Sequence, residues 1–241
     1  MSLDQPRAFV KHQTVTRDAF LGGLLTVSQP RHGFRAGLDS VLLGAAVSQG
    51  RTSLLDLGAG VGTAGLVALV HAPSLTAVLA DQNLEMLALA ADNLTANDLA
   101  ARARTLCIDV TAKGQARQAA GLLDNGFDVV IANPPFFADG AGTLAGDAGR
   151  AGSRHMDAAA LDLWVKTAAG CAAPAGEIIF IYPAESLAPL LAAFDQRFGA
   201  ITILPLTPRP GAAASRVLLR AIKGSRAPLT LLASRALHDH T

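Results

Sequence analysis

The stretch that decides the fold is residues 54–62, Leu54-Leu55-Asp56-Leu57-Gly58-Ala59-Gly60-Val61-Gly62. An apolar run ends in an acid and passes into closely spaced glycines, and a helical pattern follows over residues 63–71. Glycines let the backbone approach a ligand because no Cβ stands in the way. The pattern predicts a strand, a ligand-binding loop and a helix, which is the opening unit of an α/β nucleotide-binding fold.

The glycine loop is compatible with two kinds of cofactor. Residues 60–65 match the dinucleotide fingerprint GxGxxG, and Asp81 lies about 20 residues further on, where the acid that binds ribose is expected. A nicotinamide or flavin enzyme therefore has to be considered. Chains rich in Gly and Ala also produce this fingerprint by chance.

Three features favour S-adenosylmethionine. Asp56 lies inside the strand end, where a carboxylate suits the ammonium of a methionine moiety and does not suit a pyrophosphate. The loop contains no Arg or Lys, and Asp109 follows another apolar segment, from which it can accept a hydrogen bond from an adenine amino group. Asp81 and Asp109 can also be read as helix caps or turn residues. The expected cofactor ligands are Asp56, Gly58, Gly60, Gly62, Asp81 and Asp109.

A second motif, Asn133-Pro134-Pro135-Phe136, follows the apolar run 127–132. The Asn133 side-chain oxygen and the Pro134 carbonyl can each accept one N–H of a planar amino group, and the prolines fix the backbone and remove competing donors. Phe136 can stack on the ring that carries the amine. Adenine and the amide of a glutamine side chain both fit this arrangement. Read alone, the motif is also an ordinary turn.

Strand-like and helix-like segments alternate along the chain, which predicts an α/β fold with a doubly wound, mostly parallel sheet and right-handed crossovers. The last strands follow one another without a helix, so we expect an antiparallel hairpin at the sheet edge. Residues 14–29 are expected to form a strand pair, and Asp39-Ser40 reads as the N-cap of a helix over 41–49. The expected strands are 52–57, 75–80, 103–108, 127–132, 176–182, 200–206, 215–222 and 228–234. The expected helices are 63–71, 83–97, 114–123, 157–172 and 184–196.

Composition bounds the class of protein. At 241 residues and 51% apolar content, the chain can form one α/β domain over residues 1–241, with a cap segment 1–35 and a catalytic core 36–241. Cys107 and Cys171 lie among apolar residues without metal-ligand spacing, so we expect buried free thiols, a reducing compartment and no metal. No signal peptide and no run of about 20 apolar residues is present, which favours a cytoplasmic protein without a membrane partner.

Charge is distributed unevenly although the net charge is only +1. Residues 1–35 hold five basic and two acidic residues, and residues 207–241 hold six basic and one acidic residue. The span between them holds nine basic and sixteen acidic residues. If both ends flank the cofactor pocket, they form a basic rim that can contact phosphates of a nucleic acid. The alternative is ordinary solvated surface.

These motifs together resemble the class I S-adenosylmethionine-dependent methyltransferases, within the branch that methylates amino groups. A closer resemblance is to the bacterial tRNA1(Val) adenine-N6 methyltransferase family. It rests on GFRAGLDSVLL at 33–43, on NPPFF at 133–137 and on RVLL at 216–219 with Lys223-Gly224, and it covers roughly residues 20–235.

The resemblance implies a Rossmann-like, seven-stranded sheet and methyl transfer to the N6 of an adenine beside the anticodon of a tRNA. Catalysis would belong to Asn133, Pro134, Pro135 and Phe136. Two departures stand out: relatives often have Tyr where this chain has Phe136, and residues 138–152 are dominated by Ala and Gly. The expected substrate contacts are Arg35, Arg150, Arg154 and His155.

Three other functions stay open on the sequence. A protein-glutamine methyltransferase would use the same four-residue motif. A nicotinamide oxidoreductase would need a hydride-transfer site, which the sequence does not show. A noncatalytic RNA-binding module could keep the fold, although the intact Asp56, glycine and Asn133 set argues against loss of activity. The sequence does not indicate an oligomeric state.

Overall fold

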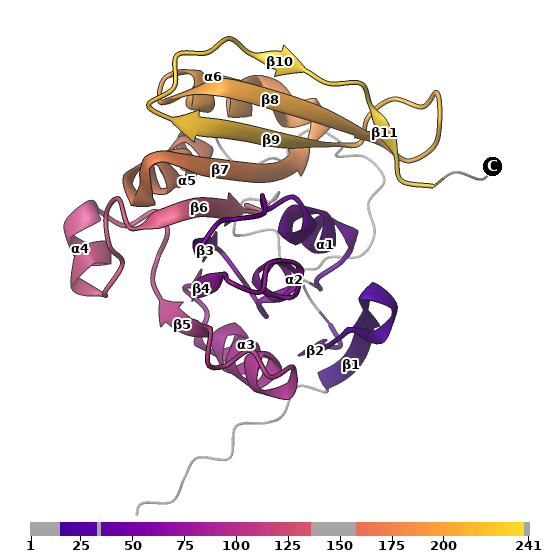
Figure 1. Cartoon of the computed structure of the whole chain (residues 1–241), viewed down its shortest axis with the longest axis vertical. Helices are drawn as coiled ribbons and strands as arrows, with labels where there is room; N and C mark the ends of the chain where they lie inside the picture. The colour runs from indigo at the N-terminus through magenta and orange to yellow at the C-terminus, as the bar shows by residue number, and fades with distance from the viewer. Residues whose placement is uncertain (1–14, 33–34, 136–157, 239–241) are drawn as a thin grey trace, which may run out of the picture.

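The computed structural model describes residues 15–32, 35–135 and 158–238. It contains one large sheet with helices on both faces and a separate two-stranded hairpin near the N-terminus (Figure 1). Short 3-10 turns lie at Leu21–Gly23 and Ala184–Ser186. The helices are α1 Leu38–Ala45, α2 Thr63–His71, α3 Leu84–Ala96, α4 Gly114–Ala119, α5 Ala158–Cys171 and α6 Leu187–Asp195. The strands are β1 Val15–Phe20, β2 Leu25–Pro30, β3 Ser53–Leu57, β4 Thr76–Asp81, β5 Ala103–Cys107, β6 Phe127–Ala132, β7 Ala172–Pro183, β8 Phe198–Thr207, β9 Arg216–Lys223, β10 Thr230–Leu231 and β11 Arg235–Ala236.

The large sheet has the strand order β10-β8-β9-β7-β6-β3-β4-β5, with β11 pairing to β8. Strands β3 to β7 are parallel to their neighbours in that group, whereas β9 runs antiparallel to both β7 and β8. The order reverses between β3 and β6, which is where open α/β sheets bind ligands. The predicted doubly wound, Rossmann-like fold is confirmed, and its seven long strands are β3 to β9.

Two hydrophobic cores fill the two faces of the sheet. One core packs Trp164 of α5 and Phe194 of α6 against Phe180 and its neighbours on the sheet. The other packs Leu43 of α1, together with α2 and α3, against the opposite face. Strands β3, β6 and β7 are buried on both sides, which explains their continuous apolar sequences.

The C-terminal strands differ in detail from the expectation. The hairpin of β8 and β9 is present, but β9 lies between β7 and β8, so that β8 is the outer strand of the pair. The predicted strand over 228–234 is reduced to β10, and a second short strand, β11, follows beyond the predicted bounds; both run parallel to β8. Strand β7 is longer than predicted because Ala172 pairs with Phe127 across a break in register.

Local corrections concern the first helix and one cysteine. Helix α1 begins at Leu38 with Gly37 as its N-cap, so the prediction of an Asp39-Ser40 cap was wrong. Cys171 is a buried free thiol, but Cys107 is exposed, because it ends the edge strand β5. The burial of Cys107 was therefore predicted wrongly.

The hairpin of β1 and β2 packs on the main body through β2. Leu25 and Val27 are fully buried in the core that α1, α2 and α3 share. The division into a cap of residues 1–35 and a core of 36–241 stays a prediction. Over the described ranges, no helix is both long and apolar enough to cross a membrane.

Candidate active site

Four parallel strands end together at one edge of the sheet. Leu57 pairs with Ala80 on one side and with Ala132 on the other, and Asp81 pairs with Cys107. The residues that follow β3, β4, β5 and β6 therefore share this edge, which we call the carboxyl edge. It carries the glycine loop after β3 together with Asp81, Asp109 and Asn133, as predicted from the order of the segments.

Asp56 is buried at the end of β3, with 2% of its surface exposed. Its Oδ2 accepts a hydrogen bond of 2.9 Å from the backbone N–H of Gly65, in the first turn of α2. Burial raises the pKa of Asp56 to about 7, the Gly65 hydrogen bond opposes that rise, and the charge of Asp81 adds to it. A cation beside this carboxyl would favour its ionised form.

Two glycines of the loop have different reasons to be glycine. Gly58 has φ +70°, and a Cβ there would lie 2.5 Å from the Trp164 ring of α5, so this glycine is required by packing. Gly60 has φ +55°, and nothing lies within 4 Å of the position its Cβ would take. Gly60 thus leaves open space at the carboxyl edge, and a ligand can reach its backbone.

Asp81 and Asp109 also shape the turns that follow their strands. Asp81 accepts one hydrogen bond of 2.8 Å from the Gly60 N–H and another of 2.8 Å from the Asn83 N–H. Asp109 is exposed and accepts from the backbone and hydroxyl of Thr111. A carboxylate has about four acceptor positions, so both acids retain capacity for hydroxyl or amino groups of a cofactor.

Asn133 carries a buried side-chain oxygen, Oδ1, without a hydrogen-bond partner in the described structure. Pro134 is buried and Pro135 is exposed. The Thr63 hydroxyl, at the first residue of α2, is also buried without a partner. A buried polar atom left unpaired costs about 1–3 kcal/mol, so two of them near one edge indicate a site built for a polar ligand. Phe136 lies outside the described residues.

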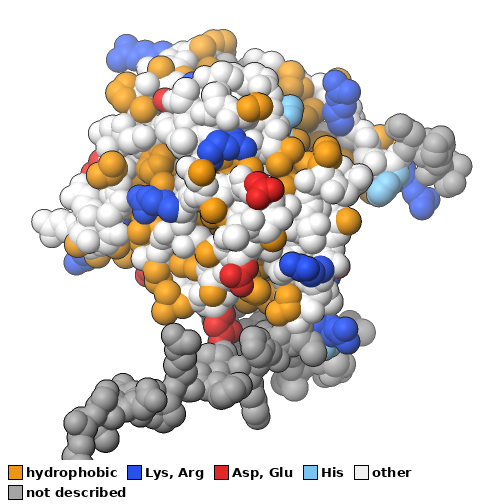
Figure 2. Space-filling view, turned by 60° about the horizontal axis from the view of Figure 1, so that its bottom comes forward, with side chains coloured by type: hydrophobic (Ala, Val, Ile, Leu, Met, Phe, Trp, Pro, Cys, Tyr) orange, Lys and Arg blue, Asp and Glu red, His pale blue; other side chains and the backbone are white. Residues whose placement is uncertain are grey.

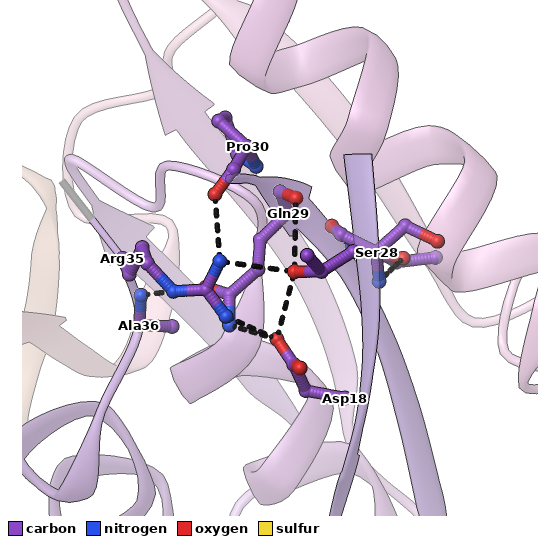
Figure 3. A network of polar contacts seen from close by, with 8 residues as sticks. Asp18, Ser28, Gln29, Pro30, Arg35 and Ala36 are labelled. Atoms are coloured by element: carbon purple, nitrogen blue, oxygen red, sulfur yellow. Dashed lines mark hydrogen bonds and ion pairs between the residues drawn. The ribbon is translucent and has the colours of Figure 1, made fainter. Parts of the chain in front are cut away.

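Arg35, expected to contact substrate, lies in a network with the N-terminal hairpin (Figure 3). Its guanidinium forms an ion pair of 2.6 Å with Asp18 and donates to the Thr16 hydroxyl and the Pro30 carbonyl. Gln29 donates to the same Asp18 oxygen and accepts from the Ala36 N–H. These contacts fix the chain where it leaves the hairpin, and the role of Arg35 in substrate binding stays a prediction. Arg150, Arg154 and His155 lie outside the described residues.

Two segments that suggested the family resemblance contact each other. Asp39 of α1 forms an ion pair of 2.9 Å with Arg216, the first residue of β9. The contact joins residues 177 positions apart in the chain. It lies at the carboxyl edge, because Arg216 pairs with Pro183 at the end of β7.

Some polar residues of this region were missed by the sequence analysis. Asn83 caps α3 by accepting from the Glu85 and Met86 N–H groups. Asn93 is fully buried on the same helix and donates to the Val61 carbonyl in the glycine loop. The detectable signal is an asparagine on the apolar face of a helix, which needs a specific partner when it is buried.

Comparisons with known proteins agree with this geometry. The family model for the methyltransferase small domain matches residues 38–149. A tRNA1(Val) (adenine(37)-N6)-methyltransferase of Shewanella loihica is 32% identical over 196 residues, which is 78% of this chain and 76% of the relative. The chain belongs to this methyltransferase family. S-adenosylmethionine is the family's cofactor, the one that Asp56, Asp109 and the lack of Arg and Lys in the glycine loop favoured.

Other members of the family align over less of their length. The Shewanella halifaxensis protein of the same name is 33% identical over 69% of this chain, and the Flavobacteriaceae bacterium protein is 32% identical over 46% of it. The chain spans 65% and 46% of the length of these two relatives.

Solved structures share the fold of this family member. A predicted O-methyltransferase from Agrobacterium tumefaciens has a TM-score of 0.71 and 33% identity, with 84% of this chain and 88% of that chain covered. A T. thermophilus 16S rRNA N2 G1207 methyltransferase, solved with AdoMet and guanosine, has a TM-score of 0.58 at 22% identity. The two structures align over 87% of this chain and 50% of the T. thermophilus chain.

The carboxyl edge fits S-adenosylmethionine on structural grounds. The carboxyl edge offers open space at Gly60, the buried Asp56 carboxyl as an acceptor for an ammonium, and the Thr63 hydroxyl, which has no partner among the described residues. Within the described ranges, no group of three or more His, Cys, Asp or Glu side chains is placed to hold a metal ion.

Proposed function

We propose that this protein methylates the N6 of adenine 37 in a tRNA of the tRNA1(Val) type, the reaction that its relatives' name describes. The observation that carries the proposal is the buried Oδ1 of Asn133 at the carboxyl edge, which has no hydrogen-bond partner among the described residues. An acceptor in that state needs a donor from a ligand, and the adenine amino group supplies two.

Each residue of the site has a task in this reaction. Asp56 would bind the ammonium of the methionine moiety, and Asp81 would accept from the ribose hydroxyls. Asp109 would accept from the adenine amino group of the cofactor. S-adenosylmethionine supplies an activated methyl group when it is bound. The open backbone at Gly60 leaves room for it.

The acceptor base is positioned by the motif after β6. Asn133 Oδ1 and the Pro134 carbonyl would each accept a hydrogen bond from one N6 hydrogen. These hydrogen bonds would localise the nitrogen lone pair and direct it toward the methyl group. Phe136 would stack on the base. A new N–C bond would form at N6 as the bond between the methyl group and the sulfonium sulfur breaks, which would leave S-adenosylhomocysteine, and one N6 proton would then leave to solvent. Positioning and hydrogen-bond polarisation supply most of the rate, so no strong general base is needed.

The partner is a single-stranded or loop adenine. Taking a base out of a stack costs a few kcal/mol and less in a loop, which favours an anticodon loop over a duplex. A hydroxyl acceptor, as the name of the Agrobacterium relative implies for that protein, would offer Asn133 and Pro134 only one donor for two acceptors.

The test uses purified protein, methyl-labelled S-adenosylmethionine, and transcripts of tRNA1(Val) with adenine or guanine at position 37. We expect N6-methyladenosine only in the adenine transcript, identified by mass spectrometry of nucleosides. Asn133→Ala should reduce transfer at least about a hundredfold because it removes a hydrogen bond to the reacting amine. Its affinity for S-adenosylmethionine should stay within about twofold of the wild-type value.

Three results would contradict the proposal. Near wild-type transfer by Asn133→Ala would remove the role of that side chain. Methylation of glutamine in a protein fraction, with none in tRNA, would point to the glutamine-methyltransferase alternative. Binding of tRNA without turnover would point to a noncatalytic RNA-binding module.

A further inference from the structure

Helix α3 holds the N-terminal hairpin through two asparagine side chains. The Asn97 amide accepts from the Thr26 N–H at 2.9 Å and donates to the Thr26 carbonyl at 2.8 Å. The Asn93 amide accepts from the Ser28 N–H at 2.7 Å and donates to the Ser28 carbonyl at 3.0 Å. Each side-chain amide thus forms the pair of hydrogen bonds with β2 that the backbone of a neighbouring strand would otherwise form.

The spacing of the two asparagines matches the spacing of the strand. Four residues along a helix rise about 6 Å, and two residues along a strand rise about 6.6–6.8 Å. Asn93 and Asn97 therefore meet the backbone N–H and C=O groups of Ser28 and Thr26, which point to the same edge of β2. Since α3 starts at the carboxyl edge, the same pairing brings the end of β2 to that edge.

Asn93 differs from Asn97 in its third contact. Its Nδ2 also donates to the Val61 carbonyl, at 3.0 Å, inside the glycine loop. Asn97 instead donates to the Asn93 carbonyl, which keeps its third contact within α3. One buried carboxamide thus holds both the hairpin and the loop.

The loop depends on contacts of this kind because its glycines restrict the backbone little. On one side, the Gly58 and Ala59 N–H groups donate to the Ala80 carbonyl, and Gly60 donates to Asp81. These contacts come from β4. Asn93 supplies a contact from α3, at Val61, two residues before the start of α2.

We propose that Asn93 is a positioning residue that couples the N-terminal hairpin to the cofactor loop, so that affinity for S-adenosylmethionine depends on Asn93 and not on Asn97. The inference rests on the proposed function, in that the glycine loop must bind the cofactor. Loss of one hydrogen bond to the loop corresponds to about a twofold to tenfold weaker cofactor affinity.

The experiment compares Asn93→Ala with Asn97→Ala in the full chain. Both variants lose a paired amide against β2, so both should lower the unfolding temperature. Titration calorimetry with S-adenosylmethionine should give a Kd that rises about fivefold for Asn93→Ala and less than about twofold for Asn97→Ala. At saturating cofactor, kcat of Asn93→Ala should return to near the wild-type value while its KM for the cofactor stays high.

Equal Kd values for the two variants would overturn the proposal. If Asn93→Ala does not fold, amide hydrogen exchange of the wild-type protein by NMR decides the matter. Saturation with S-adenosylmethionine should then protect the Ser28 amide, which is bound to Asn93, several-fold more than the Thr26 amide. Equal protection of both amides would overturn the coupling. Failure of the wild-type protein to bind S-adenosylmethionine would overturn the proposed function and, with it, the coupling that rests on it.

Discussion

At the scale of single residues, the buried Asp56 carboxyl makes the site sensitive to pH. Its pKa is raised from 3.8 to about 7, chiefly by burial. The protein without cofactor therefore gains stability from this group below about pH 4 and loses it as the pH rises through about 7. An ammonium bound beside the carboxyl would lower this pKa, so binding would release a proton near neutral pH.

We therefore expect the affinity for S-adenosylmethionine to tighten about fivefold to tenfold between about pH 6 and about pH 7.5. Calorimetric titration in two buffers of different ionisation enthalpy measures both the Kd and the proton release. Asp56→Asn removes the titrating group, so its Kd should be weaker at pH 7.5 and nearly independent of pH. A wild-type Kd that does not change over this range would contradict the role given to Asp56.

The residues that could be predicted from the sequence are those whose place in the fold follows from the segment in which they lie. Asp56 is the last residue but one of the buried strand β3 and Asn133 follows directly on β6, so both lie at the carboxyl edge. Arg35 and Asp39 were not predictable in the same way, because their partners Asp18 and Arg216 come from other elements. Pairing across such distances has no signal in a single sequence.

At the scale of elements, a buried ion pair joins the sheet to the segment after α1. Glu177 of β7 is 1% exposed and is contacted by Arg220 of β9, by the Ser48 hydroxyl at 3.0 Å, and by Arg51 at 3.4 Å. Arg220 also donates to Ser48 and to the Ala46 carbonyl. The cluster holds β9 against β7 and ties both strands to the segment that follows α1.

Arg220→Ala should destabilise the protein by about 3–5 kcal/mol, because it leaves the buried Glu177 charge without its closest partner. The matched control is Arg197→Ala, which breaks the more exposed pair with Asp162. We expect that change to cost about 1 kcal/mol or less in the ion pair itself. Equilibrium urea unfolding measures both, and similar losses for the two variants would contradict the special role of the buried pair.

Elements with strong periodicity were predicted closely, and those defined by pairing were not. The strand 127–132 and the helix 63–71 have the predicted bounds, since apolar sequence and flanking turn residues define both. Strand β7 extends back to Ala172 through Pro174 and Gly176, residues that usually interrupt a strand. The segment 228–234 is apolar, but it reaches β8 over only two residues, Thr230 and Leu231.

At the scale of the whole molecule, the basic residues near the C-terminus are divided between the carboxyl edge and the opposite edge of the sheet. Arg209 follows β8, and Arg235 pairs with Leu206 near the end of that strand, so both lie at the carboxyl edge. Arg226 lies at the opposite edge, beside Gly199 at the start of β8. Figure 1 shows the N-terminal hairpin and β11 on the same side of the molecule. On the face in Figure 2, Lys and Arg side chains stand apart from one another, without forming one basic patch.

This division predicts which basic residues contact tRNA. Arg209 and Arg235 are exposed and form no ion pair with another described residue, so they are available for phosphates beside the site. Arg209→Ala and Arg235→Ala should each raise the KM for tRNA several-fold and reduce the slope of log affinity against log salt by about 1, with kcat and cofactor affinity unchanged. Arg226→Ala is the matched control, because it also removes the charge of an exposed arginine, but at the opposite edge. An effect of Arg226→Ala as large as that of the other two would show that only net charge matters, and would contradict phosphate contacts at the carboxyl edge.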